Sequence, residues 1–148
     1  MSLMTLDEIH TCIDELFRAY NDHEIDGVLA HFTEDVLWEP DESFPLIGRT
    51  AAAALLRSQF RAFPDLRFPE EDVVIYTSPD GKAASKWHMI ATMTGRLFPP
   101  GYAPTGRTAD CTGMCAYEFR DGLICRHTVV YDVMNFSQKL GLLQAMPA

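Results

Sequence analysis

The sequence predicts an α+β fold in which helices cover one face of a strongly curved antiparallel sheet. Apolar residues recur at helical spacing through most of residues 6–63, whereas alternation with a period of two dominates residues 67–132. Two tight-turn signals, at 78–81 and at Asp121-Gly122, join strand-like runs into antiparallel hairpins. Helices first and antiparallel strands afterwards is an order typical of α+β folds. A length of 148 residues fits a single domain over 1–148.

The helical part begins with an amphipathic segment at 6–21. Thr5 is suited to cap this helix, and Asp7 and Glu8 place acids in its first turn, where the helix dipole favours them. A second, short helix is expected at 25–32, followed by a brief strand at 35–40 and a loop at 40–48. A third helix is expected at 49–63, because the residue before Pro64 avoids the α region. A last helix is expected at about 136–144.

Four long strands are expected at 67–77, 82–94, 108–119 and 123–132. A loop rich in glycine and proline, at 95–106, separates the second strand from the third. Gly113, inside the third strand, permits strong curvature. A curved sheet with helices on its concave side tends to enclose a pocket.

The last two strands form a hairpin whose register follows from its turn. Asp-Gly between β-forming residues favours a two-residue type I′ turn, which pairs the residues on either side of it symmetrically. Side-chain alternation then makes one face of the hairpin mostly apolar, and that face ends in a carboxylate. The predicted pairs are Arg120–Leu123, Phe119–Ile124, Tyr117–Arg126, Cys115–Thr128 and Cys111–Asp132.

Composition disfavours several classes of partner. The net charge is −9, from 21 acidic and 12 basic residues, so nucleic acids and anionic membrane surfaces are poor partners. Because no apolar run reaches about 18 residues and no signal-peptide core follows the start, we expect a cytoplasmic protein. The four cysteines form no CxxC pair, so we expect free thiols and no metal site. Residues 1–3, ahead of Met4, are interpreted as a remnant of cloning.

Several short strings along nearly the whole chain carry a resemblance to a known family. They are H-F-T-E-D-V at 31–36 with Trp38, G-R at 48–49, F-P-D-L-R-F at 63–68, T-G at 94–95, P-T-G-R at 104–107, D-G-L-I at 121–124, Y-D at 131–132 and L-G-L-L at 140–143. On these strings the sequence resembles the SnoaL-like polyketide cyclases, within the larger NTF2-like group of α+β cones. F-P-D-L and P-T-G-R are fairly specific to the cyclase-like branch, whereas D-G-L-I is common to the wider group.

The resemblance implies a cone-shaped pocket, dimerisation through the outer sheet face, and no metal or organic cofactor. It also implies an acid–base residue at the position of Asp132, and a polyketide-cyclase type of reaction, the aldol cyclisation. One string departs from the pattern. Where relatives often read G-T-H-T-G, this chain reads A-T-M-T-G, so Met93 stands in place of a histidine.

Asp132 and His127 are the candidate catalytic residues. At the end of an apolar strand face Asp132 would be partly desolvated, which would raise its pKa toward that of a useful general base. Alternatively, Asp132 caps the helix that follows. His127 is separated from Asp132 by an odd number of residues, so strict alternation places it on the opposite, outer face, and it reaches the pocket only if a β-bulge intervenes.

Seven further residues are candidates for lining the pocket, with ordinary core packing as the alternative for the large apolar ones. Trp87 and Met89 share a strand face, Trp38 lies near the expected mouth of the cone, and Tyr20 closes the apolar stripe of the first helix. The full set is Tyr20, Trp38, Trp87, Met89, Cys115, Thr128 and Val130.

Together these features predict an enzyme that performs cofactor-independent acid–base chemistry on a small, hydrophobic, oxygenated ring compound. Isomerisation of a steroid-like ketone, epoxide hydrolysis, a non-catalytic ligand-binding module and an interaction scaffold with a filled cone remain alternatives. An Asp132 already satisfied by backbone amides would favour the binding module. We also expect a homodimer, because one sheet face is too apolar for exposure to solvent. The residues expected on that face are Met114, Ala116, His127, Val129 and Tyr131.

Overall fold

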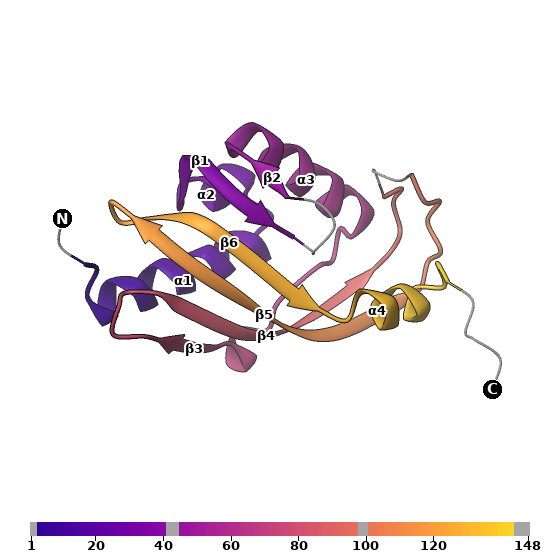
Figure 1. Ribbon diagram of the computed structural model, residues 1–148. Helices are drawn as coiled ribbons and strands as arrows, with labels where there is room; N and C mark the ends of the chain where they lie inside the picture. Colours follow the sequence, from indigo (N-terminus) through magenta and orange to yellow (C-terminus); the bar gives the residue numbers. More distant parts are fainter. Residues whose placement is uncertain (1–2, 41–44, 98–100, 144–148) are drawn as a thin grey trace.

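The computed structural model describes residues 3–40, 45–97 and 101–143, and consists of helices packed against one curved, open sheet (Figure 1). Residues 1–2 of the expected cloning remnant, parts of the two loops and the end of the last predicted helix lie outside these ranges. The helices are α1 (Leu6–Asn21), α2 (Ile25–Leu29), α3 (Arg49–Ala62) and α4 (Val133–Lys139), with a 3₁₀ turn at Glu70–Asp72. The strands are β1 (Phe32–Glu39), β2 (Leu46–Ile47), β3 (Val74–Thr77), β4 (Ala83–Thr92), β5 (Thr108–Arg120) and β6 (Leu123–Tyr131).

The strands pair in the order β2-β1-β6-β5-β4-β3. The run from β3 to β6 is antiparallel throughout, as the two turn signals predict. β1 lies parallel to β6, and β2 lies antiparallel to β1. The α+β fold with a curved sheet is therefore confirmed, and the parallel β1–β6 pair is the exception to its antiparallel arrangement.

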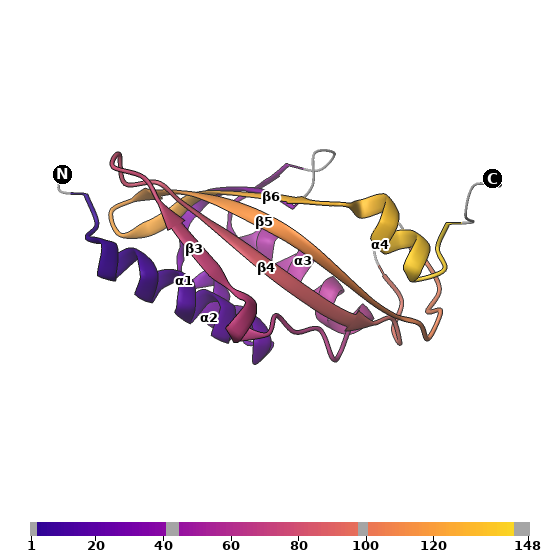
Figure 2. The same ribbon diagram turned by 90° about the horizontal axis from the view of Figure 1, so that it is seen from below.

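Helices α1, α2 and α3 lie on one face of the sheet, and α4 lies beyond its end (Figure 2). α1 begins with a capping box, in which the Thr5 hydroxyl accepts from the Glu8 amide at 3.2 Å and the Glu8 carboxylate accepts from the Thr5 amide at 2.7 Å. Within its apolar stripe Ile9, Ile13 and Leu16 are at most 2 % exposed, whereas Leu6 at the start of the helix is 60 % exposed. Burying each such side chain stabilises the fold by about 1.5–3 kcal/mol, so packing holds α1 on the sheet. Within the described ranges no helix is long and apolar enough to cross a membrane.

The F-P-D-L-R-F string at 63–68 ties the end of α3 to its neighbours. The Asp65 carboxylate accepts a hydrogen bond from the Thr92 amide of β4 at 2.7 Å. The Asn21 side chain, at the end of α1, donates to the Phe68 carbonyl at 2.8 Å and accepts from the Phe68 amide at 2.7 Å. These bonds give the string a structural role, because they fix the connection that lays α1 across the sheet.

Gly113 allows a close approach inside the sheet. A Cβ atom at this position would lie 2.4 Å from the Trp87 ring and 2.8 Å from the Val130 carbonyl oxygen. The absence of a side chain lets the edge of the Trp87 indole pack directly against β5, opposite its paired residue Gly113, where it is buried.

The register of the β5–β6 hairpin is confirmed beside the turn and wrong beyond it. Asp121 and Gly122 have φ values of 54° and 78°, as a type I′ turn requires, and the two pairs next to them are the predicted ones. A bulge at Cys125 then inserts one residue into β6, so every later side chain of β6 turns to the face opposite the predicted one. The observed pairs include Tyr117–His127, Ala116–Thr128, Cys115–Val129 and Gly113–Tyr131.

Candidate ligand-binding site

His127 lies on the inner face of the sheet, where the bulge has turned it. Its side chain is 3 % exposed. Its ring stacks on the Trp38 ring, with centroids 5.6 Å apart and planes 5° apart, and on the Tyr117 ring, at 5.1 Å and 21°. The Phe32 ring lies 5.7 Å away. The imidazole is thus the middle of a column of aromatic rings that crosses β1, β6 and β5.

This column follows from backbone pairing. Trp38 pairs directly with His127 across the parallel β1–β6 ladder, and Tyr117 pairs directly with His127 across the antiparallel β5–β6 ladder. Directly paired residues of neighbouring strands place their side chains side by side on the same face. The position of His127 therefore depends on the bulge and on β1 joining the sheet.

Two members of this column, His127 and Trp38, have buried polar atoms without partners in the described part of the chain. Among the described residues, neither ring nitrogen of His127 forms a hydrogen bond, and the same holds for the Trp38 indole nitrogen. Burial lowers the pKa of His127 to about 3. At neutral pH the side chain is a neutral imidazole with one N–H donor and one acceptor nitrogen, both left unused.

A second polar group lies next to the column, on β4 and β5. The hydroxyls of Tyr117 and Ser85 are 2.7 Å apart, and the Trp87 indole donates to the Cys115 sulfur at 3.2 Å. Burial raises the pKa of the Cys115 thiol to about 11 and raises the pKa of Tyr117 above its usual value. Burial likewise raises the pKa of Tyr20. The inner face is therefore polar at several points, yet uncharged at neutral pH.

Burial along the inner face of β6 falls toward the end of the strand. Ile124 and His127 are buried, whereas Val129 and Tyr131 are only partly buried. The inner face of β6 is thus least covered at its Tyr131 end. Packed side chains occupy the column itself, and two cavities of the described residues open elsewhere, beside α1 and on the outer face of β3 and β4.

The structure gathers five of the predicted lining residues on the inner side. Tyr20, Trp38, Trp87, Met89 and Cys115 are all buried there, at most 9 % exposed. His127 joins them, as the sequence allowed only with a bulge. Ser85, completely buried beside Tyr117, was missed, because a serine in a strand carries no signal of its own.

The other three residues predicted for this face do not lie on it. The Thr128 hydroxyl donates to the Glu39 carboxylate at 2.8 Å, on the outer face, and Val130 is 61 % exposed. Asp132 is exposed and caps α4, accepting from the Asn135 amide at 2.9 Å. The desolvation on which its expected role as a base depends is therefore absent. The cause is again the bulge, which exchanged the two faces of β6.

The predicted dimer face is corrected for the same reason. Met114 and Ala116 are exposed on the outer face of β5, but His127, Val129 and Tyr131 belong to the inner face.

As for metals, no group of three or more histidine, cysteine, aspartate or glutamate side chains within the described ranges could hold an ion.

Comparison with known proteins supports the fold. A proposed polyketide cyclase from Silicibacter sp. TM1040 superposes with a TM-score of 0.82 at 22 % identity, covering 96 % of this chain and 99 % of the other. One from Xanthomonas campestris gives 0.79 at 21 %, covering 90 % and 97 %. AclR, a proposed hydroxylase from Streptomyces galilaeus, gives 0.79 at 24 %, covering 97 % and 91 %.

At these identities the structural matches establish the NTF2-like fold alone. No curated protein matches the sequence. The model of the SnoaL-like polyketide cyclase family, however, matches residues 10–140, which is most of the chain. On that match, the chain belongs to the SnoaL-like polyketide cyclase family.

Proposed function

We propose that the protein binds a small, hydrophobic, oxygenated ring compound inside the cone and catalyses a proton transfer on it, with His127 as the acid–base group. The observation that supports this most is a completely buried imidazole with both nitrogens unpartnered. A buried donor or acceptor without a partner costs about 1–3 kcal/mol. A ligand with a carbonyl or hydroxyl oxygen would offset that cost.

The neutral imidazole of His127 has a pKa of about 3 in the closed structure, and a bound enolate oxygen beside the ring would stabilise the imidazolium and raise that pKa toward the working range of a general base. One nitrogen accepts a proton from the carbon next to a ligand carbonyl, and the N–H on the other side of the ring donates to a different oxygen of the ligand, because the two nitrogens point in directions that diverge too far to serve one carbonyl and its neighbouring carbon. In an aldol cyclisation the resulting enolate carbon bonds to a second carbonyl carbon, and the alkoxide formed there takes the proton back from the imidazolium. These reaction steps need no cofactor, since every proton and electron pair stays on the ligand and the histidine.

The aromatic rings around His127 would set the ligand's class. Trp38, Tyr117 and Phe32 offer flat apolar surfaces, and flat ring compounds gain most from stacking on them. Because the column is closed in this structure, binding requires these side chains to separate, and the less buried Tyr131 end of β6 is the direction from which a ligand would enter.

A non-catalytic binding module is the second candidate. It is favoured by Asp132, whose carboxylate accepts from a backbone amide at the surface. Among the described residues, moreover, the buried polar side chains are Thr33, Ser58, Ser85 and His127, which include no carboxylate. If Asp132, at the family's acid–base position, only caps a helix, the protein would bind its ligand without converting it. Catalysis would then require His127 to carry out the proton transfer.

The two candidates are separated by proton exchange on a ketone probe. We would incubate 2-tetralone, a bicyclic aromatic ketone, with the protein in D₂O, follow loss of its α-proton signals by NMR, and measure binding from tryptophan fluorescence. The proposal expects exchange that His127→Phe reduces about 10²-fold or more, while Asp132→Asn leaves it unchanged.

Each other outcome rejects part of the proposal. Binding without exchange in the wild-type protein would favour the binding module. Exchange lost in Asp132→Asn but kept in His127→Phe would restore Asp132 as the base. Absence of binding to this and related ring ketones would argue against a ligand site in the cone.

We further propose a homodimer formed through the outer sheet face. Val74, Lys86, Met114 and Val130 pair in one row across β3, β4, β5 and β6. The apolar members are 44 %, 43 % and 61 % exposed, and Tyr76 in the next row is 50 % exposed. Contact with a second copy would bury this apolar surface. Sedimentation at micromolar concentration tests it: a dimer that Val130→Asp separates supports the face, and a wild-type monomer rejects it.

A further inference from the structure

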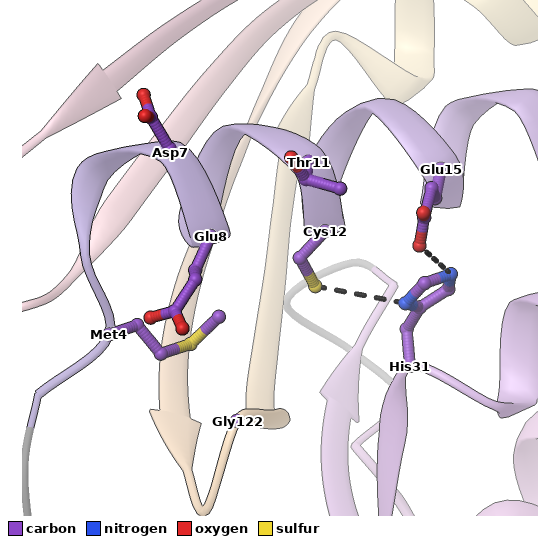
Figure 3. A pocket seen from close by; sticks show the side chains of 8 residues that line it. All are labelled: Met4, Asp7, Glu8, Thr11, Cys12, Glu15, His31 and Gly122. Carbon is purple, nitrogen blue, oxygen red and sulfur yellow. Dashed lines mark hydrogen bonds and ion pairs between the residues drawn. The ribbon is translucent and has the colours of Figure 1, made fainter.

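A second group of reactive side chains lines a surface groove of about 350 Å³ between α1 and the tip of the β5–β6 hairpin (Figure 3). The Cys12 and Glu15 side chains enter the groove from α1. The side chain of His31, the residue just before β1, enters it from the other side. The Cys12 sulfur lies 3.8 Å from Nδ1 of His31, and Nε2 of His31 lies 3.8 Å from the Glu15 carboxylate. The three side chains form a line with the imidazole in the middle.

Helix spacing and the α2–β1 connection create this arrangement. Cys12 and Glu15 are three residues apart, which places their side chains next to each other on α1. The His31 backbone is fixed by a hydrogen bond from its amide to the Val28 carbonyl at 3.2 Å and by one from the Ile124 amide to its own carbonyl at 2.8 Å. The ring is thus held against α1 from a second part of the chain.

The charges decide which nitrogen of His31 carries the proton. A carboxylate facing Nε2 favours the tautomer with N–H at that nitrogen. Nδ1 is then an acceptor that faces the thiol. Burial, the larger effect, lowers the pKa of His31, and Glu15 opposes it, so the imidazole is mainly neutral at pH 7 and able to accept a proton. Burial and Glu15 raise the pKa of Cys12 to about 11, so the sulfur keeps its proton until it reacts.

We propose that Cys12 and His31 form a thiol–imidazole pair that reacts with neutral or cationic soft electrophiles in this groove. With an α,β-unsaturated amide, the sulfur bonds to the β-carbon, and the electron pair of the C=C bond moves to the α-carbon. The thiol proton passes to Nδ1 of His31 and then to the α-carbon. His31 ends neutral, and the reaction consumes no oxidant or reductant. Asp7, Glu8 and Glu15 around the groove disfavour anionic reagents.

Cys111 provides a matched control within the same chain. It is 7 % exposed, as Cys12 is, and burial raises its pKa to about 11 as well. The charged groups near it are Lys139 and Asp110, in place of a histidine. A difference in reactivity between Cys12 and Cys111 therefore measures the contribution of the His31 contact.

The experiment is alkylation of the folded protein by acrylamide, with each cysteine-containing peptide quantified by mass spectrometry from pH 6 to 9. At pH 7.5 we expect Cys12 to react about 10-fold or more faster than Cys111, within the range of general-base assistance. The Cys12 rate should level off above pH 7, where His31 is fully neutral. His31→Gln should remove the advantage and leave the Cys111 rate, which reports an intact fold, unchanged.

Two further comparisons complete the test. Glu15→Gln should lower the rate of Cys12 alkylation and shift its pH profile, since the Glu15 carboxylate holds the His31 tautomer that accepts the thiol proton. Relative to free cysteine, Cys12 should prefer iodoacetamide to the anionic iodoacetate. A Cys12 rate within twofold of that of Cys111, a tenfold rise per pH unit through pH 9, or a rate unaffected by His31→Gln would each overturn the proposal.

Discussion

The two faces of β6 differ in how they treat polar groups, although they alternate along a single strand. On the outer face Arg126 donates to Glu39 at 2.9 Å, and Thr128 donates to the same carboxylate at 2.8 Å. On the inner face His127 is buried with no hydrogen-bond partner among the described residues. The outer face holds charges that neighbouring side chains already pair, whereas the inner face holds a neutral group with unused hydrogen-bonding capacity.

This difference teaches where to look for chemistry in this fold. A carboxylate at the end of an apolar strand pointed to Asp132 as the base, but this carboxylate is exposed and caps a helix. The more informative feature is the polar group that the fold buries at a cost, because a ligand that hydrogen-bonds to it would offset that cost. Five predictions test the contrast between the faces.

Deleting Cys125 should prevent folding. Without the bulge residue, the part of β6 after it must either turn Thr128 and Val130 inward or shift its register against β1 and β5. Both choices lose the packing of the aromatic column, so we expect a loss of more than about 4 kcal/mol. Circular dichroism and denaturant titration measure it. The control variant Cys125→Ala keeps the number of residues in β6 and should fold normally. A stable deletion variant would show that the bulge does not decide which β6 side chains point inward.

Acid should destabilise the wild-type protein through His127. Its pKa is lowered to about 3 in the folded state, so below the unfolded value of roughly 6.5 the unfolded chain binds the extra proton. Stability is therefore complete above pH 6.5 and falls as the pH drops toward 3, by roughly 1.4 kcal/mol per unit. Between pH 7 and pH 5, urea titration should show a loss of about 2 kcal/mol that His127→Phe lacks.

The same variant gives a second reading at pH 7. Replacing the imidazole with an aromatic ring of similar shape removes two buried polar atoms without partners, so His127→Phe should be about 1 kcal/mol more stable than wild type. Equal pH dependence in the two proteins would mean that water or a partner reaches the imidazole in solution.

Gly113→Ala should destabilise the inner face by about 1–3 kcal/mol, because the new Cβ collides with the Trp87 ring and the Val130 carbonyl. Its cost should be smaller when Trp87 is already replaced by leucine. A double-mutant cycle measures this coupling, which we expect to exceed about 0.5 kcal/mol. Additive effects would indicate that the strain comes from the backbone carbonyl alone.

Asp132→Ala should cost about 1 kcal/mol, the value of an N-cap, whereas Asp132→Asn should cost a few tenths because asparagine caps equally well. Thermal unfolding of both variants compares them. If the asparagine variant were as unstable as the alanine variant, the negative charge would matter beyond the hydrogen bond to Asn135.

Much of the fold could be predicted from local patterns. The capping box at Thr5, the helical stripe of α1 and the type I′ turn at Asp121-Gly122 are all confirmed. Each depends on residues within a few positions of one another, so the sequence carries the information directly. The candidate site was predicted less well: Tyr20, Trp38, Trp87, Met89 and Cys115 lie on the expected side, but Asp132, Thr128 and Val130 were placed on the wrong face.

The sequence by itself therefore determined the first and third helices, the three long strands that come last in the chain, the two tight turns and the choice between two positions for His127, one of which required a bulge. Of the strand expected at 67–77 only Val74–Thr77 forms, and the last helix begins at Val133, before the expected start at 136. The tertiary structure alone decided that the bulge at Cys125 exists and that β1 lies parallel to β6, which brings Trp38 against His127. A bulge depends on how a strand must twist to pack against both neighbours and the helices beneath it. Those contacts join residues far apart in the chain, so no local pattern records them.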